Sequence, residues 1–168
     1  YNEADNLKIL LPFLKENTKN KQVEIIISDG GSSDRTVAIA NAYDVKVLKS
    51  PNKGRAAQMN YAATLATGDV LQFVHADTIP PKSFYEDIEK AIAENYPAGC
   101  FTYRFDTNHL LLKVNAFFTR FDKIWCRGGD QAIFISKAIF EEFGGYPNYL
   151  IMEEYQLLEK IQAKYPFK

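Results

Sequence analysis

Three short runs rich in valine and isoleucine, each followed by a helical pattern, constrain the fold of this chain more than any other feature. The runs are VEIIISD at residues 23–29, VKVLKS at 45–50 and DVLQFVHAD at 69–77. Short apolar runs of this kind are typical of strands that are buried on both faces. The segments DRTVAIANAY, RAAQMNYAATLAT and KSFYEDIEKAIAEN that follow them read as helices. This alternation predicts an α/β fold with a mostly parallel sheet flanked by helices.

The rest of the chain predicts further elements of the same domain. Leucines recur at helical spacing in residues 4–16, which indicates an amphipathic helix that is strained or ended near Pro12. Residues 98–105 and 130–136 are expected to form strands, and residues 109–125, 137–143 and 153–165 are expected to form helices. The chain has 168 residues, of which 46% are hydrophobic, and it shows no repeat or linker. It is therefore long enough to bury the core of one domain.

Composition and charge exclude several classes of protein. The net charge of −1 provides no basic surface for nucleic acid. Cys100 and Cys126 lack a metal-binding spacing and are too few for a disulfide framework, so we expect a reduced, cytoplasmic protein. No apolar run approaches the ~20 residues of a membrane span, and no signal-peptide pattern is seen. Because the chain opens on a helical pattern without a preceding strand, we expect both termini to be trimmed from a longer chain.

Polar segments follow each of the three predicted strands, at the edge where parallel α/β sheets bind ligands. In SDGGSSD, Asp29 can accept hydrogen bonds from a nucleobase while Gly30 allows close approach of the backbone. Asp29 and Ser32 can equally form an Asx-type turn before the next helix, and the segment alone favours that turn. Neither the dinucleotide fingerprint nor the P-loop pattern is present.

The second polar segment, KSPNKGR, predicts an anion site. It places Gly54 and Arg55 at the start of a helix, where backbone N–H groups and the helix dipole favour negative charge. Arg55 could add a bidentate contact to a phosphate. A surface cap with solvated Lys53 and Arg55 is the alternative.

The third polar segment, HADT, contains candidate metal ligands. Asp77 is a hard oxygen ligand suited to Mg²⁺ or Mn²⁺, and His75 is a nitrogen ligand on the same side of an extended chain. The alternative is a satisfied histidine at the end of a strand, followed by Asp77 as a cap of a turn. An H-x-D sequence by itself favours the alternative.

Two further segments carry polar groups that could act on a substrate. Glu153 and Glu154 begin a predicted helix, where acidic residues either complement the helix dipole or supply a general base. Asp130 and Gln131 follow a double glycine, where they either form a turn or hydrogen-bond a polar ligand.

Taken in order, the motifs YNE, SDGGSSDRT, KGRAAQMN, HADT, RGGDQAIF and IMEE resemble the family 2 glycosyltransferases with the GT-A fold. The resemblance spans nearly the whole chain, and it is greatest to a bacterial subgroup with HAD in place of D-x-D. It implies a nucleotide-sugar donor, a divalent metal (Mn²⁺ or Mg²⁺) and inverting transfer to an acceptor hydroxyl. It also implies one GT-A domain over residues 1–168, with a nucleotide-binding half at 1–95 and an acceptor-binding half at 96–168. A strand rich in valine and isoleucine should precede YNE.

The resemblance assigns roles to individual residues. Asp77 matches the metal-binding aspartate of D-x-D, and His75 replaces the first aspartate. The base motif, Glu-Asp in the family, is Glu153-Glu154 here, and we expect Glu154 or else Glu153 to take the proton. Asp130 and Gln131 should orient the acceptor or donor sugar. The nucleotide is expected to contact Glu3, Asp29, Gly30, Ser32, Gly54, Arg55 and His75.

Other properties of the reaction follow from the same resemblance. The Q-x-x-R-W motif of processive synthases is absent, which predicts single additions. The acceptor, whether a glycan, a lipid or a small molecule, is not specified by these residues, and peripheral association with the inner face of a membrane is a further expectation. Two other classes of protein fit the same residues: a nucleotidyltransferase, and a catalytically silent domain that binds a sugar nucleotide.

Overall fold

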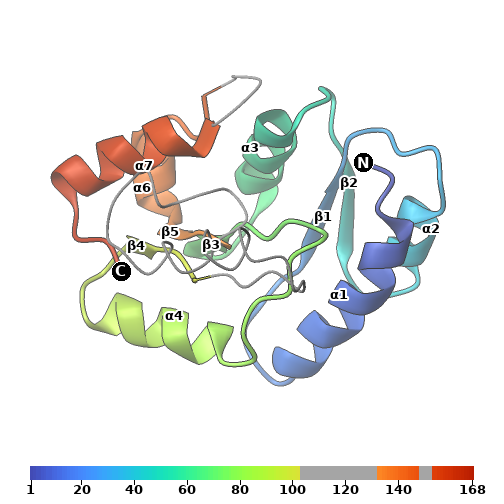
Figure 1. Ribbon diagram of the computed structural model, residues 1–168, viewed down its shortest axis with the longest axis horizontal. Coiled ribbons are helices and arrows are strands. Elements are labelled where there is room, and N and C mark those ends of the chain that lie inside the picture. The colour runs from blue at the N-terminus through green and yellow to red at the C-terminus, as the bar shows by residue number, and fades with distance from the viewer. Residues whose placement is uncertain (103–131, 148–152) are drawn as a thin grey trace, which may run out of the picture.

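The computed structural model describes residues 1–102, 132–147 and 153–168 (Figure 1). The helix expected at 109–125 therefore lies outside the described residues, as do Asp130 and Gln131. None of the helices within these ranges is long and apolar enough to cross a membrane.

The first half of the chain alternates helices and strands as predicted. In order it contains α1 (Ala4–Asn17), β1 (Ile26–Asp29), α2 (Thr36–Asn41), β2 (Lys46–Lys49), α3 (Arg55–Leu65), β3 (Val70–Gln72) and α4 (Phe84–Ala93). The second half contributes β4 (Ala98–Gly99), β5 (Phe134–Ser136), α6 (Lys137–Glu142) and α7 (Glu153–Lys164). The strands are shorter than the apolar runs that predict them, because only part of each run meets a partner strand.

The strands form two hydrogen-bonded groups. β1 and β2 are parallel, with Ile27 opposite Val47. β5 lies between β3 and β4 and is antiparallel to both. The predicted α/β fold with a parallel sheet and flanking helices is confirmed, and the antiparallel pairs belong to the strands after β2. In Figure 1, α6 and α7 lie on one side of the β3–β5–β4 group and α4 lies on the other.

Helix α1 continues through Pro12 to Asn17, so the expected end of the helix at this residue is wrong. Proline removes one intrahelical hydrogen bond and crowds the preceding turn. Four buried leucines on one face (Leu7, Leu10, Leu11 and Leu14) extend both before and after the proline. Their packing holds the helix together up to Asn17.

Two hydrophobic clusters pack against the strands. One contains the leucines of α1 with Ala40 and Phe84, and Ile25 and Ile27 pack against it. The other contains Ala56 and Ala63 of α3, Leu71 of β3 and residues of β5, α6 and α7. Helices therefore cover both faces of the strands, which explains why the strand sequences are apolar without alternation.

Candidate active site

Asp29 ends β1 and holds the turn that follows it. The carboxylate accepts hydrogen bonds from the N–H groups of Gly31 (2.8 Å) and Ser32 (2.9 Å), and also from the Ser32 hydroxyl. Burial raises the pKa of the Asp29 carboxyl, but these hydrogen bonds outweigh burial and hold the pKa below its ordinary value of 3.8. The Asx-type turn is therefore present. Recognition of a base by Asp29 stays a prediction. It is compatible with the turn, because the carboxylate oxygens retain further acceptor capacity.

The first residues of the chain lie against this turn. The Asn2 N–H donates to the Ser32 hydroxyl (2.9 Å), and the Ser33 N–H donates back to the Asn2 side chain (2.9 Å). The Glu3 N–H donates to the Thr36 hydroxyl (2.8 Å). These contacts join segments about thirty residues apart in sequence and bring Glu3 to the end of β1.

The glycines next to these residues allow close packing and an unusual backbone conformation. A Cβ at Gly30 would lie 2.7 Å from Oε1 of Gln58, whose Nε2 donates to the Ser28 carbonyl (2.8 Å). Gly54 has a φ of +118° directly before Arg55, the first residue of α3. Glycine adopts this conformation without strain, which lets the chain turn directly into the helix.

His75 and Glu154 lie close together beyond the end of β3. Nε2 of His75, three residues beyond β3, lies 3.9 Å from Oε1 of Glu154 in the first turn of α7. The His75 side chain is 15% exposed and that of Glu154 is 4% exposed. A carboxylate so deeply buried needs polar neighbours, and His75 supplies one. Glu153 begins α7, and its side chain is not among those described.

Asp77 is exposed in the turn after β3, where the Thr78 N–H donates to the His75 carbonyl (3.0 Å). Its Oδ1 lies 3.4 Å from the Thr78 hydroxyl. Within the described ranges, no three side chains of histidine, cysteine, aspartate or glutamate gather as a complete metal site. One accessible carboxylate nevertheless fits Mg²⁺ or Mn²⁺ that is also bound by the phosphates of a substrate, since these ions need few ligands from protein.

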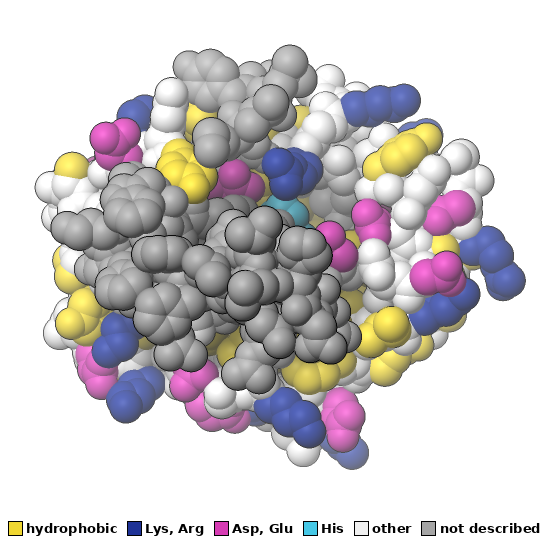
Figure 2. All heavy atoms as spheres, in the orientation of Figure 1, with side chains coloured by type: hydrophobic (Ala, Val, Ile, Leu, Met, Phe, Trp, Pro, Cys, Tyr) yellow, Lys and Arg dark blue, Asp and Glu magenta, His cyan; other side chains and the backbone are white. Residues whose placement is uncertain are grey.

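Several of the predicted site residues line one cavity of about 790 Å³. Glu3, Asp29, Arg55 and His75 contribute to its wall, with Tyr1 beside them. Figure 2 shows a histidine side chain in a hollow of the surface, with basic and acidic side chains around it. The structure thus brings together residues from the polar segments that follow β1, β2 and β3.

Sequence reasoning missed Gln58 and Glu24. Gln58 is a polar residue in an alanine-rich helical segment, one turn after Arg55. Its polar side chain among alanines could have marked it as a site residue. Glu24 accepts hydrogen bonds from the N–H and hydroxyl groups of Thr67 and from the Gly68 N–H (3.2 Å). These hydrogen bonds link Glu24 to residues more than forty positions later in the sequence, and no local pattern reveals such a link.

Comparison with known proteins gives a consistent family. The sequence profile described as Glycosyl transferase family 2 matches residues 1–144. An uncharacterized glycosyltransferase of Rickettsia bellii is 33% identical over 75 residues, and one of Rickettsia felis is 34% identical over 77 residues. These matches cover 45% and 46% of this chain, and 26% and 27% of the relatives.

Solved structures share the fold at low sequence identity. A mannosyltransferase from Pyrobaculum calidifontis, in complex with GDP-Man and Mn²⁺, has a TM-score of 0.79 at 18% identity, with 99% of this chain and 51% of that chain covered. S. aureus TarS 1–349 in complex with UDP has a TM-score of 0.76 at 17% identity, with 95% and 52% covered. Glucosyl-3-phosphoglycerate synthase from Mycobacterium tuberculosis has a TM-score of 0.72 at 17% identity, with 98% and 63% covered. The chain therefore spans about a quarter of the curated relatives and half or more of these structures.

Proposed function

Because this chain belongs to glycosyl transferase family 2, we propose that it moves a sugar from a nucleoside-diphosphate sugar to an acceptor hydroxyl, with inversion and in single additions. The observation that carries the proposal is the convergence of Asp29, Arg55 and His75 on one cavity, with Glu154 of the last helix beside His75. Polar groups from three successive strand ends suit a ligand with a base, a diphosphate and a sugar.

The nucleoside end of the donor would lie near Glu3 and Asp29, and the diphosphate near Arg55. Arg55 is exposed at the start of an eleven-residue helix, and the first N–H groups of a helix are suited to bind an anion. Similar structures contain GDP-Man in one protein and UDP in another, which supports a nucleotide sugar as the class of donor. The choice between uracil and guanine would depend on contacts around Asp29.

Asp77 would hold a divalent metal together with the diphosphate. Mn²⁺ is present in two of the similar structures, which supports its use here. A bound Mn²⁺ or Mg²⁺ stabilises the negative charge that develops on a leaving diphosphate. Arg55 would contribute to the same stabilisation from the start of α3.

Glu154 would act as the general base. In the proposed step, the acceptor oxygen forms a bond to the anomeric carbon while the bond from that carbon to the diphosphate oxygen breaks. The electron pair leaves with the nucleoside diphosphate, and the acceptor proton passes to the Glu154 carboxylate. His75 lies 3.9 Å from this carboxylate and would limit the orientations available to it.

The test begins with binding of candidate donors. UDP, GDP, UDP-GlcNAc and GDP-Man are compared by thermal shift with and without Mn²⁺, followed by detection of nucleoside diphosphate release in the presence of pooled acceptors. We expect one base to stabilise the protein, and to do so more strongly with Mn²⁺. Arg55→Ala should weaken this effect, whereas Lys53→Ala, in the same loop but away from the cavity, should not.

Other outcomes would assign the chain to a different class. Consumption of a sugar 1-phosphate and a nucleoside triphosphate, with release of pyrophosphate, would identify a nucleotidyltransferase. Donor binding without turnover for any acceptor would identify a binding domain. No nucleotide-dependent shift at all would contradict the proposed donor site.

A further inference from the structure

The first residues of α1 are held by side chains from about thirty residues later in the chain. The Glu3 N–H donates to the Thr36 hydroxyl (2.8 Å), and the Ala4 N–H donates to Oδ2 of Asp34 (3.2 Å). The first N–H groups of an α-helix have no partner within the helix, and the side chain of Glu3 does not cap α1. The start of α1 is therefore capped by residues at the start of α2.

The Thr36 hydroxyl connects Glu3 to a carboxylate. A hydroxyl donates one hydrogen and accepts through its lone pairs. The Thr36 hydroxyl donates to Oδ1 of Asp34 and accepts from the Glu3 N–H, while the Thr36 N–H also donates to Oδ1 of Asp34 (2.9 Å). Thr36 is 3% exposed, so water has little access to its hydroxyl. The direction of hydrogen bonding, from Glu3 through Thr36 to Asp34, is therefore fixed.

The charge on Asp34 strengthens this arrangement. The hydrogen bond from the Thr36 hydroxyl is the main reason that the pKa of the Asp34 carboxyl lies below its ordinary value of 3.8. Hydrogen bonds to an ionised acceptor are stronger than those between neutral groups. Donation to the carboxylate also polarises the hydroxyl, which makes its oxygen a better acceptor for the Glu3 N–H.

The same pattern occurs at the preceding residue of the chain. The Asn2 N–H donates to the Ser32 hydroxyl, which donates to the Asp29 carboxylate. Consecutive residues, Asn2 and Glu3, are thus each held by a hydroxyl that is oriented by a carboxylate. Asp29 lines the cavity of the candidate site, whereas Asp34 is exposed and does not line it. Asp34 can therefore affect a ligand in this cavity only through the residues that it holds.

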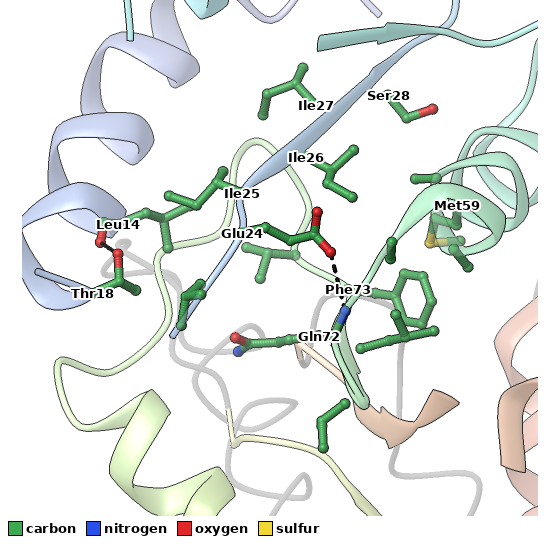
Figure 3. A pocket seen from close by; sticks show the side chains of 18 of the residues that line it. Leu14, Thr18, Glu24, Ile25, Ile26, Ile27, Ser28, Met59, Gln72 and Phe73 are labelled. Carbon is green, nitrogen blue, oxygen red and sulfur yellow. Dashed lines mark hydrogen bonds between the residues drawn. The ribbon is translucent and has the colours of Figure 1, made fainter. Parts of the chain in front are cut away.

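Glu3 is the residue of α1 that this network brings to the site. Glu3 and Asp29 both line the cavity, and Nδ2 of Asn6 donates to Oε2 of Glu3 (2.6 Å). The Glu3 carboxylate retains capacity to accept hydrogen bonds from hydroxyl or N–H groups of a nucleoside. Along β1 the wall of the cavity is aliphatic at Ile26 and Ile27 (Figure 3). The polar contacts for a nucleoside are therefore expected beyond the end of β1.

We propose that Thr36, oriented by Asp34, is a positioning residue for the nucleotide-sugar donor, because it holds Glu3 in place at the nucleoside end of the site. This inference rests on the proposed function. A side chain that is already held in place loses little freedom when a ligand binds, so it contributes more to affinity. Without the Thr36 hydroxyl, the Glu3 N–H loses its acceptor, and the donor must order Glu3 as it binds.

The test measures the Kd of UDP and of GDP with Mn²⁺ by titration calorimetry, below the melting temperature of every variant. Thr36→Val keeps the shape of the side chain and removes the hydroxyl, and we expect it to raise the Kd of the preferred nucleotide by about 3–10-fold. Thr36→Ser keeps the hydroxyl and should restore binding. Thr64→Val is the matched control, because the exposed Thr64 hydroxyl donates to the Tyr61 carbonyl (2.8 Å) within α3, and it should leave the Kd unchanged.

Double variants test whether Thr36 acts through Glu3. In a Glu3→Ala background, Thr36→Val should cause no further loss of affinity, because the side chain that it positions is absent. Arg55→Ala changes the diphosphate end of the site, so its effect and that of Thr36→Val should multiply. Asp34→Ala should weaken binding in the same direction as Thr36→Val. The two together should lose no more than the larger single loss, since Asp34 and Thr36 act in series.

Several results would overturn the inference and leave the proposed function intact. Equal Kd values for Thr36→Val and the unchanged protein would show that the hydroxyl does not affect the donor site. An undiminished effect of Thr36→Val in the Glu3→Ala background would show that Thr36 acts on the whole fold. Failure of Thr36→Ser to restore binding would show that the methyl group matters instead.

Two further outcomes complete the test. If Thr36→Val does not fold, an unchanged Kd in Asp34→Ala would overturn the inference, and a raised Kd that is absent in the Glu3→Ala background would support it. Failure of the unchanged protein to bind either UDP or GDP would contradict the proposed function itself, and this inference with it.

Discussion

Replacing Asn60 by alanine tests how the segment after α6 is held against α3. The Asn60 side chain in α3 donates to the Tyr146 carbonyl (2.8 Å) and accepts from the Tyr146 N–H (2.9 Å), across 86 residues of sequence. Tyr146 is 2% exposed and packs against Phe73, with ring centroids 5.0 Å apart. Phe73 lies two residues before His75, so this contact joins the segment after α6 to the segment after β3 that carries His75.

The expected loss is large for one substitution. Each hydrogen bond contributes about 0.5–1.5 kcal/mol, and leaving a buried N–H or C=O without a partner costs about 1–3 kcal/mol. Two such groups in one buried residue predict a loss of about 2–6 kcal/mol in the free energy of unfolding. For a chain of 168 residues this corresponds to a fall of roughly 5–25 °C in melting temperature. Alanine is the better helix former, so its propensity partly offsets the loss.

The assay is urea denaturation of Asn60→Ala beside a matched control, Asn41→Ala. Asn41 is the exposed last residue of α2, so its replacement should change the free energy of unfolding by no more than about 0.5 kcal/mol. Equal stability of the two variants would refute the reasoning, since it would mean that the Tyr146 backbone groups find other partners.

Three further predictions concern the candidate site. Asp29→Asn should lower the free energy of unfolding at neutral pH, because a lowered carboxyl pKa stabilises the fold while the group is ionised. The difference from the unchanged protein should shrink as the pH falls from 3.8 through the lower folded-state pKa of Asp29. Denaturation across this pH range measures the difference, and a constant value would contradict the prediction. Glu154→Gln should lower turnover by about 10²–10⁴-fold with little change in donor affinity, whereas Glu153→Gln should lower turnover less. Steady-state kinetics and donor titration measure both variants, and a larger loss of turnover in Glu153→Gln would reverse the assignment. Asp77→Ala should remove the additional thermal shift that Mn²⁺ gives to a bound nucleoside diphosphate, and an undiminished shift would place the metal elsewhere.

Local patterns predicted much of the secondary structure. The leucine spacing of residues 4–16 and the alanine-rich pattern after Gly54 correspond to α1 and α3, and the apolar runs correspond to β1, β2 and β3. These predictions hold because periodicity records which side of a segment is buried, whatever buries it. The alternative that α1 ends at Pro12 is wrong, because packing of the leucines outweighs the local preference of proline to end a helix.

The candidate site was predictable residue by residue but not as an arrangement. The order of motifs placed Asp29, Arg55 and His75 at strand ends, and the described residues bring these three to one cavity. Asp29 accepts three hydrogen bonds from its own turn, which was one of the two alternatives, and its recognition of a base stays a prediction. Asp130 and Gln131 lie outside the described residues, so their roles stay predictions.

The sequence by itself determined the elements, their apolar faces and the family, because each of these depends on residues near one another in the chain or on an ordered set of motifs. Only the tertiary structure decided that β3 pairs antiparallel with β5, that Glu154 lies 3.9 Å from His75 and that Asp29, Arg55 and His75 line one cavity. These features depend on which strand edges and helix faces meet across the molecule. That choice is made by the packing of the whole core, so no single segment encodes it.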